Sequence, residues 1–370
     1  MGGLAEYAWC QAEALSKSGA EIIFVSTPDF LNGRPVSFAK REFIGGLIRL
    51  ESNDWPKKLI LLWNYSVCRL VLAWHVAKHR PDLVFLHNFV EYMAPLWIWP
   101  HLFLARVFGI RYAANLHDPV RSYAVGPKWW HRWSVWLAYL PLEFVTIHEA
   151  LADPSVVPKR IQTVFIPHGL YKISPGGFDP ALVRAEWGVA PGQKVFLAFG
   201  FVRDGKNLDL SIRALAQAPE AFLVVAGSVA SPKDRQYADY RALAAEMGVA
   251  QRCRFFENFV PDAELGKYFV GADFVLLTYS SKFHSQSGVL NLAAKARKPV
   301  LASGAPGALV ETVKKFDLGM VVDPDSLDAV VGGMKSLLIQ GSKPRWDEYE
   351  GFASWAVNAA EVLKAVGISH

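Results

Sequence analysis

The sequence has few cysteines and no long uninterrupted apolar run. Its 370 residues contain three cysteines, Cys10, Cys68 and Cys253, and no C-x-x-C pair, so neither a disulfide framework nor a structural zinc site is indicated. The longest apolar tracts, 59–77 and 93–110, are broken by polar, basic and proline residues, and neither is typical of a membrane span. No signal peptide precedes the first helix-like segment, so we expect a chain that stays in the cytoplasm.

The sequence also lacks any Gly-x-Gly pair, and hence the Gly-x-Gly-x-x-Gly fingerprint of dinucleotide-binding folds. This absence disfavours a nicotinamide-dependent dehydrogenase or epimerase, although either would also be an α/β protein. Apolar residues are abundant: 52% of the residues are hydrophobic and 20% are charged. This hydrophobic fraction is enough to build sizeable cores. At this length, two globular domains are the first expectation.

The excess of basic charge lies in the first half of the chain. Residues 1–175 contain 18 Lys and Arg against 13 Asp and Glu, whereas residues 176–370 contain 21 of each class. Ten of the 13 tryptophans also fall in the first half. A basic, Trp-rich surface is typical of a protein that touches an anionic bilayer, although an aromatic core with some surface lysines gives the same counts.

One segment, 128–140, concentrates these residues. Helical spacing places several large apolar side chains on one face beside basic residues, namely Trp129, Trp133, Trp136, Leu137 and Leu140. We favour packing of this face into the core of the first domain, and an interfacial helix at a membrane surface is the alternative.

Short apolar runs alternate with helical runs, which predicts parallel sheets. The expected strands are 21–26, 82–87, 112–117, 145–148, 195–200, 222–227, 254–256, 274–278 and 299–303, and helices are expected at 5–18 and 59–78. A Pro-Gly-Gly sequence breaks the alternation, so a linker near 172–180 should divide two doubly wound domains. The tail, 347–366, is predicted to be one helix. No strand precedes the glycines at the start, so we expect the natural start to lie upstream.

The stretch 195–206 is the most informative part of the sequence. An apolar strand runs into a turn that presents Arg203 and Lys206, and two cations three residues apart suit a diphosphate. Downstream, Ser285-Gln286-Ser287-Gly288 opens a helical run, and a helix N-terminus with free backbone N–H groups is a second anion-binding element. Together they predict a nucleotide-sugar site. A solvated Arg and Lys on a loop is the alternative interpretation.

Several separate stretches resemble family-4 glycosyltransferases of the GT-B fold, and the likeness spans essentially the whole chain. In the first half they are Gly2-Gly3, Gly19-Ala20-Glu21, residues 81–87, Leu116-His117-Asp118 and Ile166-Pro167-His168-Gly169. In the second half they are residues 199–203 with Lys206, residues 285–290, Lys298-Pro299-Val300 and residues 352–355. No single motif is highly specific, so the resemblance rests on their order and spacing.

The resemblance implies an α/β protein of the GT-B fold, with two doubly wound Rossmann-like domains facing a cleft. The first domain would be 1–175 and the nucleotide-sugar-binding domain 176–345, with a C-terminal helix, 346–370, that returns to the first domain. The implied reaction is a retaining transfer from a nucleotide diphosphate sugar. We expect a hexose to be transferred from a UDP- or GDP-sugar to a polysaccharide or lipid-linked glycan, and the expected acceptor rests on the placement of basic charge and tryptophan alone. No metal, no other cofactor and no nucleic-acid partner is expected. The basic, Trp-rich first domain would contact the inner face of the cell membrane.

The resemblance also assigns residues to roles. Arg203 and Lys206 would neutralise the charge that builds on the departing diphosphate. His117 would contact the transferred sugar, with a buried structural histidine as the alternative. The implied catalytic residues are therefore His117, Arg203 and Lys206. The implied donor-binding residues are Gly2, Gly3, Gly200, Arg203, Lys206, His284, Ser285, Ser287, Gly288 and Val289.

Two positions depart from the pattern of that family. Many members carry two glutamates separated by seven residues, and His284 and Leu292 stand at those places. Leu292 cannot accept a hydrogen bond from a ribose hydroxyl. The rival hypothesis is therefore a non-catalytic sugar-nucleotide-binding homologue or a scaffold in polysaccharide assembly. The sequence Asp323-Pro324-Asp325 looks like a metal–diphosphate motif, but its place between a strand and a helix predicts capping and turn roles.

Overall fold

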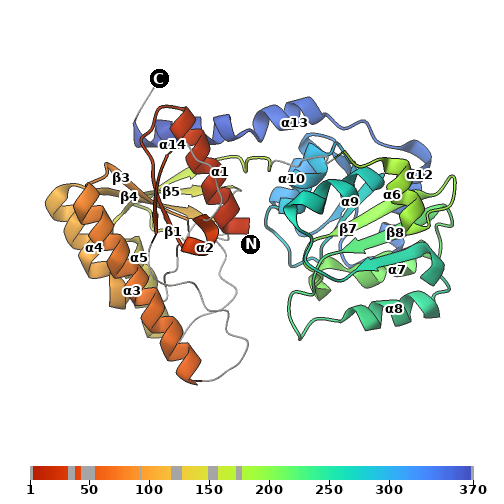
Figure 1. Ribbon diagram of the computed structural model, residues 1–370, viewed down its shortest axis with the longest axis horizontal. Helices are drawn as coiled ribbons and strands as arrows, with labels where there is room; N and C mark the ends of the chain where they lie inside the picture. Colours follow the sequence, from red (N-terminus) through yellow and green to blue (C-terminus); the bar gives the residue numbers. More distant parts are fainter. Residues whose placement is uncertain are drawn as a thin grey trace. The chain divides into compact units, whose positions relative to one another are not determined.

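The computed structural model describes residues 3–31, 38–42, 55–87, 89, 91, 93–117, 127–148, 157–171 and 177–367 (Figure 1). The chain divides into two compact units: Met1–Gly169 with Trp355–His370, and Leu170–Ser354. The chain therefore enters the second unit before the predicted boundary at 175 and leaves it after the one at 345. Of the linker predicted near 172–180, residues 172–176 lie outside the described residues.

A parallel four-stranded sheet forms the centre of the first unit. Its strand order is β3 (Leu83–Leu86), β4 (Arg111–Leu116), β5 (Leu142–Ile147) and β6 (Gln162–Phe165). A separate parallel pair joins β1 (Ile23–Ser26) to β2 (Ala39–Glu42). The apolar runs predicted β1, β3, β4 and β5. The pattern of apolar runs did not predict β2 or β6, because β2 is Ala-Lys-Arg-Glu and three of the four β6 residues are exposed.

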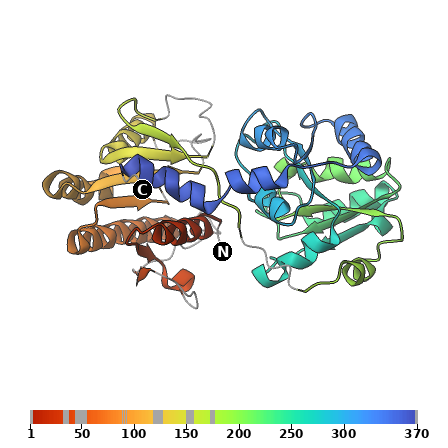
Figure 2. The ribbon, with the colours of Figure 1, turned by 90° about the horizontal axis from the view of Figure 1, so that it is seen from above.

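Helices cover both faces of this sheet. Helix α1 (Gly3–Lys17) packs beside α14 (Trp355–Val366) and shares a core with Phe85 (Figures 1 and 2). Helices α3 (Trp55–His79), α4 (Ala94–Phe108) and α5 (Lys128–Tyr139) share a core with Val84 and Leu86. Because successive strand residues point to opposite faces, the two helix groups lie on opposite sides of β3. The short helix α2 (Pro28–Leu31) follows β1.

The return of α14 to the first unit is fixed by buried hydrogen bonds. Asn358 lies in α14 and is fully buried. Its side-chain oxygen accepts a hydrogen bond from Gln11 Nε2 at 2.6 Å, and its Nδ2 donates to Tyr7 Oη and to the Pro167 carbonyl, each at 2.7 Å. One amide thus connects α1, α14 and the segment that follows β6.

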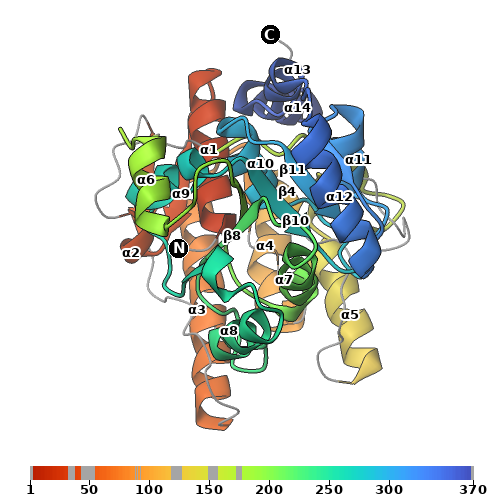
Figure 3. The same ribbon diagram turned by 90° about the vertical axis from the view of Figure 1, so that its right-hand side faces the viewer.

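The second unit contains one parallel sheet of six strands (Figure 3). Its order is β12 (Gly319–Val321), β11 (Val300–Ser303), β10 (Phe274–Thr278), β7 (Lys194–Phe199), β8 (Ala221–Ala226) and β9 (Cys253–Phe256). If the six strands are numbered 1 to 6 in chain order from β7 to β12, their order from the β9 edge is 3-2-1-4-5-6. This is the order of a doubly wound sheet. The direction of strand addition reverses between β7 and β10. Such a switch point is where open α/β sheets bind ligands, at the carboxyl ends of the strands.

Helices also cover both faces of the second sheet, because its strand residues alternate between two cores. Val195, Leu197 and Phe199 of β7 belong to one core, and Phe196 belongs to the other. The helices are α6 (Pro180–Trp187), α7 (Leu208–Leu215), α8 (Tyr237–Glu246), α9 (Leu265–Gly271), α10 (Gly288–Lys295), α11 (Ala308–Lys315), α12 (Leu327–Gln340) and α13 (Trp346–Phe352). Short 3₁₀ turns occur at Asp204–Lys206, Ala250–Arg252 and Asp262–Glu264.

Two sequence predictions are wrong. The single helix expected over 347–366 is two helices, because α13 ends at Phe352 and α14 begins at Trp355. The predicted packing of the α5 face into the core is wrong for its tryptophans, because Trp129, Trp133 and Trp136 are 65%, 39% and 58% exposed. Leu137 and Leu140 of the same face do pack into the core. Within the described residues, no helix combines the length and apolar character needed to cross a bilayer.

Candidate functional site

The turn that carries the two predicted cations lies at the switch point of the second sheet. Strand β7 ends at Phe199, and Gly200 follows with φ 83°, a left-handed conformation that glycine adopts without strain. The turn is held against the end of β10, because Thr278 Oγ1 donates to the Lys206 carbonyl at 3.0 Å and the Ser280 N–H donates to the Gly205 carbonyl at 2.9 Å. The position of the turn is therefore set by both strands that flank the switch point.

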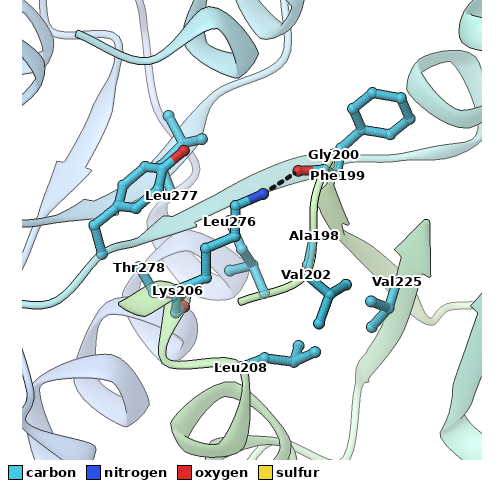
Figure 4. Close-up of a pocket in the computed structure, with 11 residues that line it drawn as sticks. Ala198, Phe199, Gly200, Val202, Lys206, Leu208, Val225, Leu276, Leu277 and Thr278 are labelled. Atoms are coloured by element: carbon cyan, nitrogen blue, oxygen red, sulfur yellow. Dashed lines mark hydrogen bonds between the residues drawn. The ribbon is translucent and has the colours of Figure 1, made fainter. Parts of the chain in front are cut away.

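The ammonium of Lys206 is directed back to the end of β7 (Figure 4). Its Nζ donates to the Phe199 carbonyl at 2.6 Å, beside a cavity of about 20 Å³ that has room for about one water. Burial, assisted by the nearby charge of Arg203, lowers the pKa of Lys206 to about 7. A bound anion would offset this penalty on the charged form, so Lys206 suits a site that binds negative charge.

Arg203 lies above two aromatic rings that the sequence did not predict at this site. Its guanidinium carbon is 5.9 Å from the ring centroid of Tyr279 and 5.8 Å from that of Phe283. The two rings stack on each other with centroids 3.9 Å apart and planes 14° apart. The Arg203 side chain is exposed at the surface of the second unit. The rings therefore support a cation that can still be reached by a ligand.

The predicted helix N-terminus lies close to this turn. Ser287 precedes α10 and is buried, and its Oγ is 2.9 Å from Tyr279 Oη. A Cβ built on Gly200 would lie 3.5 Å from Lys206 Nζ and 3.6 Å from Val289 Cγ2. Gly288, the first residue of α10, is exposed. The structure thus gathers Gly200, Arg203, Lys206, Ser287, Gly288 and Val289 around the switch point.

The remaining residues predicted in the second unit are placed differently. His284 is exposed, and its Nδ1 lies 3.4 Å from the Pro306 carbonyl. Ser285 is half-buried. Leu292 is half-buried and packs against the core of the unit. Asp325 accepts hydrogen bonds from Asn207 Nδ2 at 2.8 Å and from the Ser281 N–H at 2.9 Å, which is a loop-fixing role.

His117 lies in the first unit within a cluster of four histidines. His87, His117 and His148 directly follow β3, β4 and β5, and His168 lies three residues beyond β6. The ring of Tyr7 packs against all four, with centroid separations of 6.0, 4.6, 4.9 and 4.9 Å. The signal for this cluster was a histidine after each strand, because parallel strands bring their carboxyl ends to one edge of the sheet. Of these four histidines, only His117 was predicted to be a site residue.

Hydrogen bonds define two of the tautomers. His148 Nδ1 is 3.1 Å from the Ile166 carbonyl and His168 Nδ1 is 2.9 Å from the Gly169 carbonyl, so both Nδ1 atoms carry the hydrogen. Nε2 of His117, Nε2 of His148 and Nδ1 of His87 have no hydrogen-bond partner within the described structure. No group of three or more His, Cys, Asp or Glu among the described residues is arranged to hold a metal ion.

Desolvation keeps these imidazoles neutral. It lowers the pKa of His87 and His168 to about 4, of His148 to about 3 and of His117 to about 2, and the charges of neighbouring imidazoles add to the last two shifts. A neutral His117 could exchange hydrogen bonds with sugar hydroxyls but could not act as a cation near pH 7. Of the two predicted N-terminal glycines, Gly3 begins α1 and Gly2 lies outside the described residues.

The fold is that of the GT-B glycosyltransferases, with two Rossmann-like α/β domains. A glycosyltransferase from Rickettsia africae ESF-5 matches with a TM-score of 0.71 and 14% identity, over 99% of this chain and 94% of that chain. The Anabaena protein HepE in complex with UDP-glucose matches with a TM-score of 0.69 and 17% identity, over 99% and 95%. At these identities the likeness shows the fold alone.

Residues 181–351, which lie within the second unit, match the model of the family described as Glycosyl transferases group 1. A D-inositol 3-phosphate glycosyltransferase of Mycobacterium sp. strain JLS is 28% identical over 200 residues, which cover 54% of this chain and 43% of that protein. The one from Nocardia farcinica is 30% identical over 222 residues, covering 56% and 47%. The chain thus spans less than half the length of these curated relatives.

Proposed function

We propose that this chain is a family-4 glycosyltransferase that transfers a hexose, with retention of anomeric configuration and without a metal, from a UDP- or GDP-sugar to a polysaccharide or lipid-linked glycan. The observation that carries the proposal is the position of Arg203 and Lys206 at the switch point of a Rossmann sheet, inside a group 1 glycosyltransferase domain. The names of the solved and curated relatives support a UDP-sugar donor and a polar acceptor.

The cations supply a substantial part of the donor binding energy. Two charge-assisted contacts contribute roughly 1.5–3 kcal/mol each, and the N-terminus of α10 adds about 0.3–2 kcal/mol. Micromolar affinity needs about 8 kcal/mol. Contacts to the base and the sugar would supply the remainder.

The proposed reaction exchanges one bond at the anomeric carbon for another. The bond from that carbon to the diphosphate oxygen breaks, and a bond to the acceptor oxygen forms on the same face of the sugar. A phosphate oxygen of the donor takes the acceptor's proton. Arg203 and Lys206 stabilise the charge that develops on the departing diphosphate, and His117 binds a hydroxyl of the transferred sugar. Cations and hydrogen-bond donors that already lie where negative charge develops accelerate the step, because the protein need not rearrange to stabilise that charge.

A second candidate function is a sugar-nucleotide-binding protein without transferase activity. One observation favours it: Leu292 packs against the core and offers no acceptor to a ribose. The enzyme and the binding protein would share the diphosphate site. They differ in whether the donor's glycosidic bond to the diphosphate is broken.

The experiment that separates the two has two steps. Thermal-shift measurements of the full chain with a panel of UDP- and GDP-hexoses first identify the donor. The bound donor is then incubated with the chain and a lipid extract of its source cells, and free nucleoside diphosphate is measured. If nucleoside diphosphate is released, and the Arg203→Ala variant releases less of it, the result supports the transferase. A thermal shift with no release supports the binding protein, and the absence of any shift contradicts both.

We also propose that the protein works in the cytoplasm, at the inner face of the membrane that carries its acceptor. This location fits the basic, Trp-rich first half of the sequence.

A further inference from the structure

Three helices of the first unit carry stripes of exposed large apolar side chains. We call these stripes together the tryptophan face: Trp63, Leu70 and Trp74 of α3, Leu96, Trp99, Phe103 and Val107 of α4, and Trp129, Trp133 and Trp136 of α5. The spacing of three, four or seven residues places each set on one side of its helix. Exposure reaches 70% at Trp63 and 59% at Phe103. Scattered apolar residues are normal at a surface, but three aligned stripes are not.

The stripes belong to one layer of helices. Helix α4 packs against both α3 and α5, and all three bury their opposite sides on the sheet. Helix α4 shows the division clearly, because Trp97, Ile98 and Leu102 are at most 7% exposed while Trp99 and Phe103 are more than half exposed. The outward stripes therefore do not serve the core of the unit.

The charged side chains of the three helices that carry the tryptophan face have one sign. Helices α3, α4 and α5 contain no Asp or Glu, and their cations include the exposed residues Lys78, Arg106, Lys128 and Arg132. Two cations lie directly beside exposed rings: Lys78 Nζ is 5.0 Å from the ring of Trp74, and the guanidinium of Arg80 is 4.8 Å from that of Phe108. Exposed rings on helices that carry cations and no acids match the interface of a bilayer with anionic headgroups.

We propose that the tryptophan face is the membrane-docking surface of this protein, with its rings inserted at the headgroup level of an anionic lipid bilayer. The proposal rests on the proposed function in that a lipid-linked acceptor would be met at such a surface. A second copy of this chain fits less well, because the face would then meet its own positive charge. Tryptophan is also the residue that membrane interfaces select, since its ring is apolar and its N–H is polar.

The test is co-sedimentation of the full chain with phosphatidylcholine vesicles that contain or lack phosphatidylglycerol. The face variant is Trp99→Ser/Phe103→Ser/Trp136→Ser. The matched control is Leu182→Ser/Phe259→Ser/Ile339→Ser, which removes three exposed apolar residues of the second unit. We expect the face variant to lower partitioning onto anionic vesicles by about tenfold or more, and the control to partition as the unchanged chain does. Equal partitioning of all three proteins overturns the proposal.

A second arm tests the charges. Lys128→Glu/Arg132→Glu should remove most of the preference for vesicles with phosphatidylglycerol, and added salt should weaken binding of the unchanged chain. If the chain binds no vesicle, or if it forms a dimer that the face variant abolishes, the proposal is wrong. Thermal shifts with the nucleotide sugar are measured on the same variants. A retained shift together with lost vesicle binding separates this inference from the proposed function.

Discussion

The phenol ring of Tyr7 meets the imidazole of His117 edge-on, with ring centroids 4.6 Å apart and planes 86° apart. Tyr7 comes from the first helix, and His117 follows the second strand of the four-stranded sheet. Three further imidazoles surround the same phenol ring. The edge of this sheet at the carboxyl ends of its strands is therefore filled by aromatic rings, and protonation of its four neutral imidazoles would be costly.

This arrangement predicts instability in acid. The pKa values of His87, His117, His148 and His168 lie between about 2 and about 4 in the folded chain, against 6.5 in the unfolded one. Below pH 6.5 the unfolded state thus binds more protons, so the cluster's contribution to stability is present above pH 6.5 and is lost as the pH falls toward 4. Each histidine contributes a slope of about 1.4 kcal/mol per pH unit in that range.

Urea unfolding between pH 5 and pH 8 measures this slope. We expect His117→Gln to remove about one proton from the difference between the unfolded and folded states. The control is His284→Gln, which removes an exposed histidine of the second unit. A free energy of unfolding that stays level from pH 8 to pH 5 in the unchanged chain would contradict the assignment of neutral, desolvated imidazoles.

The cluster also shows where the sequence stops being informative. A histidine after each apolar strand could be read from the sequence, as could the strands themselves, because buried parallel strands are apolar runs. That the four rings meet around Tyr7 depends on the strand order β3-β4-β5-β6, which the sequence does not state. Strands were predicted from apolar runs, so the sequence did not predict β6, in which three of the four residues are exposed.

The position of the turn with the two cations was predicted better. The turn with Arg203 and Lys206 could be located because an apolar strand precedes it, and the strand order places that turn at the switch point. The aromatic support was not predictable, because Tyr279 and Phe283 belong to a loop after β10 and reach Arg203 only in three dimensions. The outward orientation of Trp129 was also missed, since helical spacing defines a face without saying what covers it.

Removing the two cations should reduce turnover more than folding. Arg203 is exposed, so Arg203→Ala should leave the melting temperature nearly unchanged while lowering kcat by about 10²–10³-fold, as expected for loss of a transition-state contact. Arg203→Ala/Lys206→Ala should abolish measurable turnover. The control is Arg241→Ala, which removes an exposed arginine paired with Glu257 in the same unit. If Arg241→Ala lost as much activity as Arg203→Ala, the reaction would depend on the total positive charge of the unit and not on this turn.

Donor affinity should depend on the protonation of Lys206. The pKa of this residue is about 7 in the free protein, and a bound diphosphate should raise it because the anion stabilises the ammonium. Above pH 7, binding must therefore take up a proton, and affinity for UDP should fall by up to about tenfold per pH unit. Calorimetry in two buffers with different ionisation enthalpies measures the proton uptake. Lys206→Met should show none at pH 8, whereas an unchanged uptake would assign the effect to another group.

The buried amide of Asn358 should be essential to the first unit. Asn358→Asp replaces the donor to Tyr7 and Pro167 with an acceptor and buries a charge, so we expect it to prevent stable folding of that unit. Asn358→Ala, which leaves the partners unsatisfied, should cost about 1–3 kcal/mol or more. The control on the same helix is Lys364→Ala, since Lys364 is 77% exposed. Chemical unfolding monitored by circular dichroism gives the free energies, and equal values for Asn358→Ala and the control would refute the role of the amide.

Gly227, which lies against Gly200, should fix the position of the turn that carries Lys206. A Cβ on Gly227 would lie 2.3 Å from the Gly200 carbonyl oxygen and 2.7 Å from the carbonyl carbon, which are backbone atoms that cannot give way without moving the turn. Gly227→Ala should therefore displace Lys206 and weaken UDP binding, in addition to the backbone strain of about 1–3 kcal/mol at φ 143°. Gly248→Ala is the matched control, because its φ is 69° and nothing lies within 4 Å of the added carbon. Melting temperatures measured with and without UDP separate backbone strain from displacement of the turn. Gly248→Ala should lose stability and keep its UDP shift. A full UDP shift in Gly227→Ala would show that the close approach of Gly227 to Gly200 does not position the site.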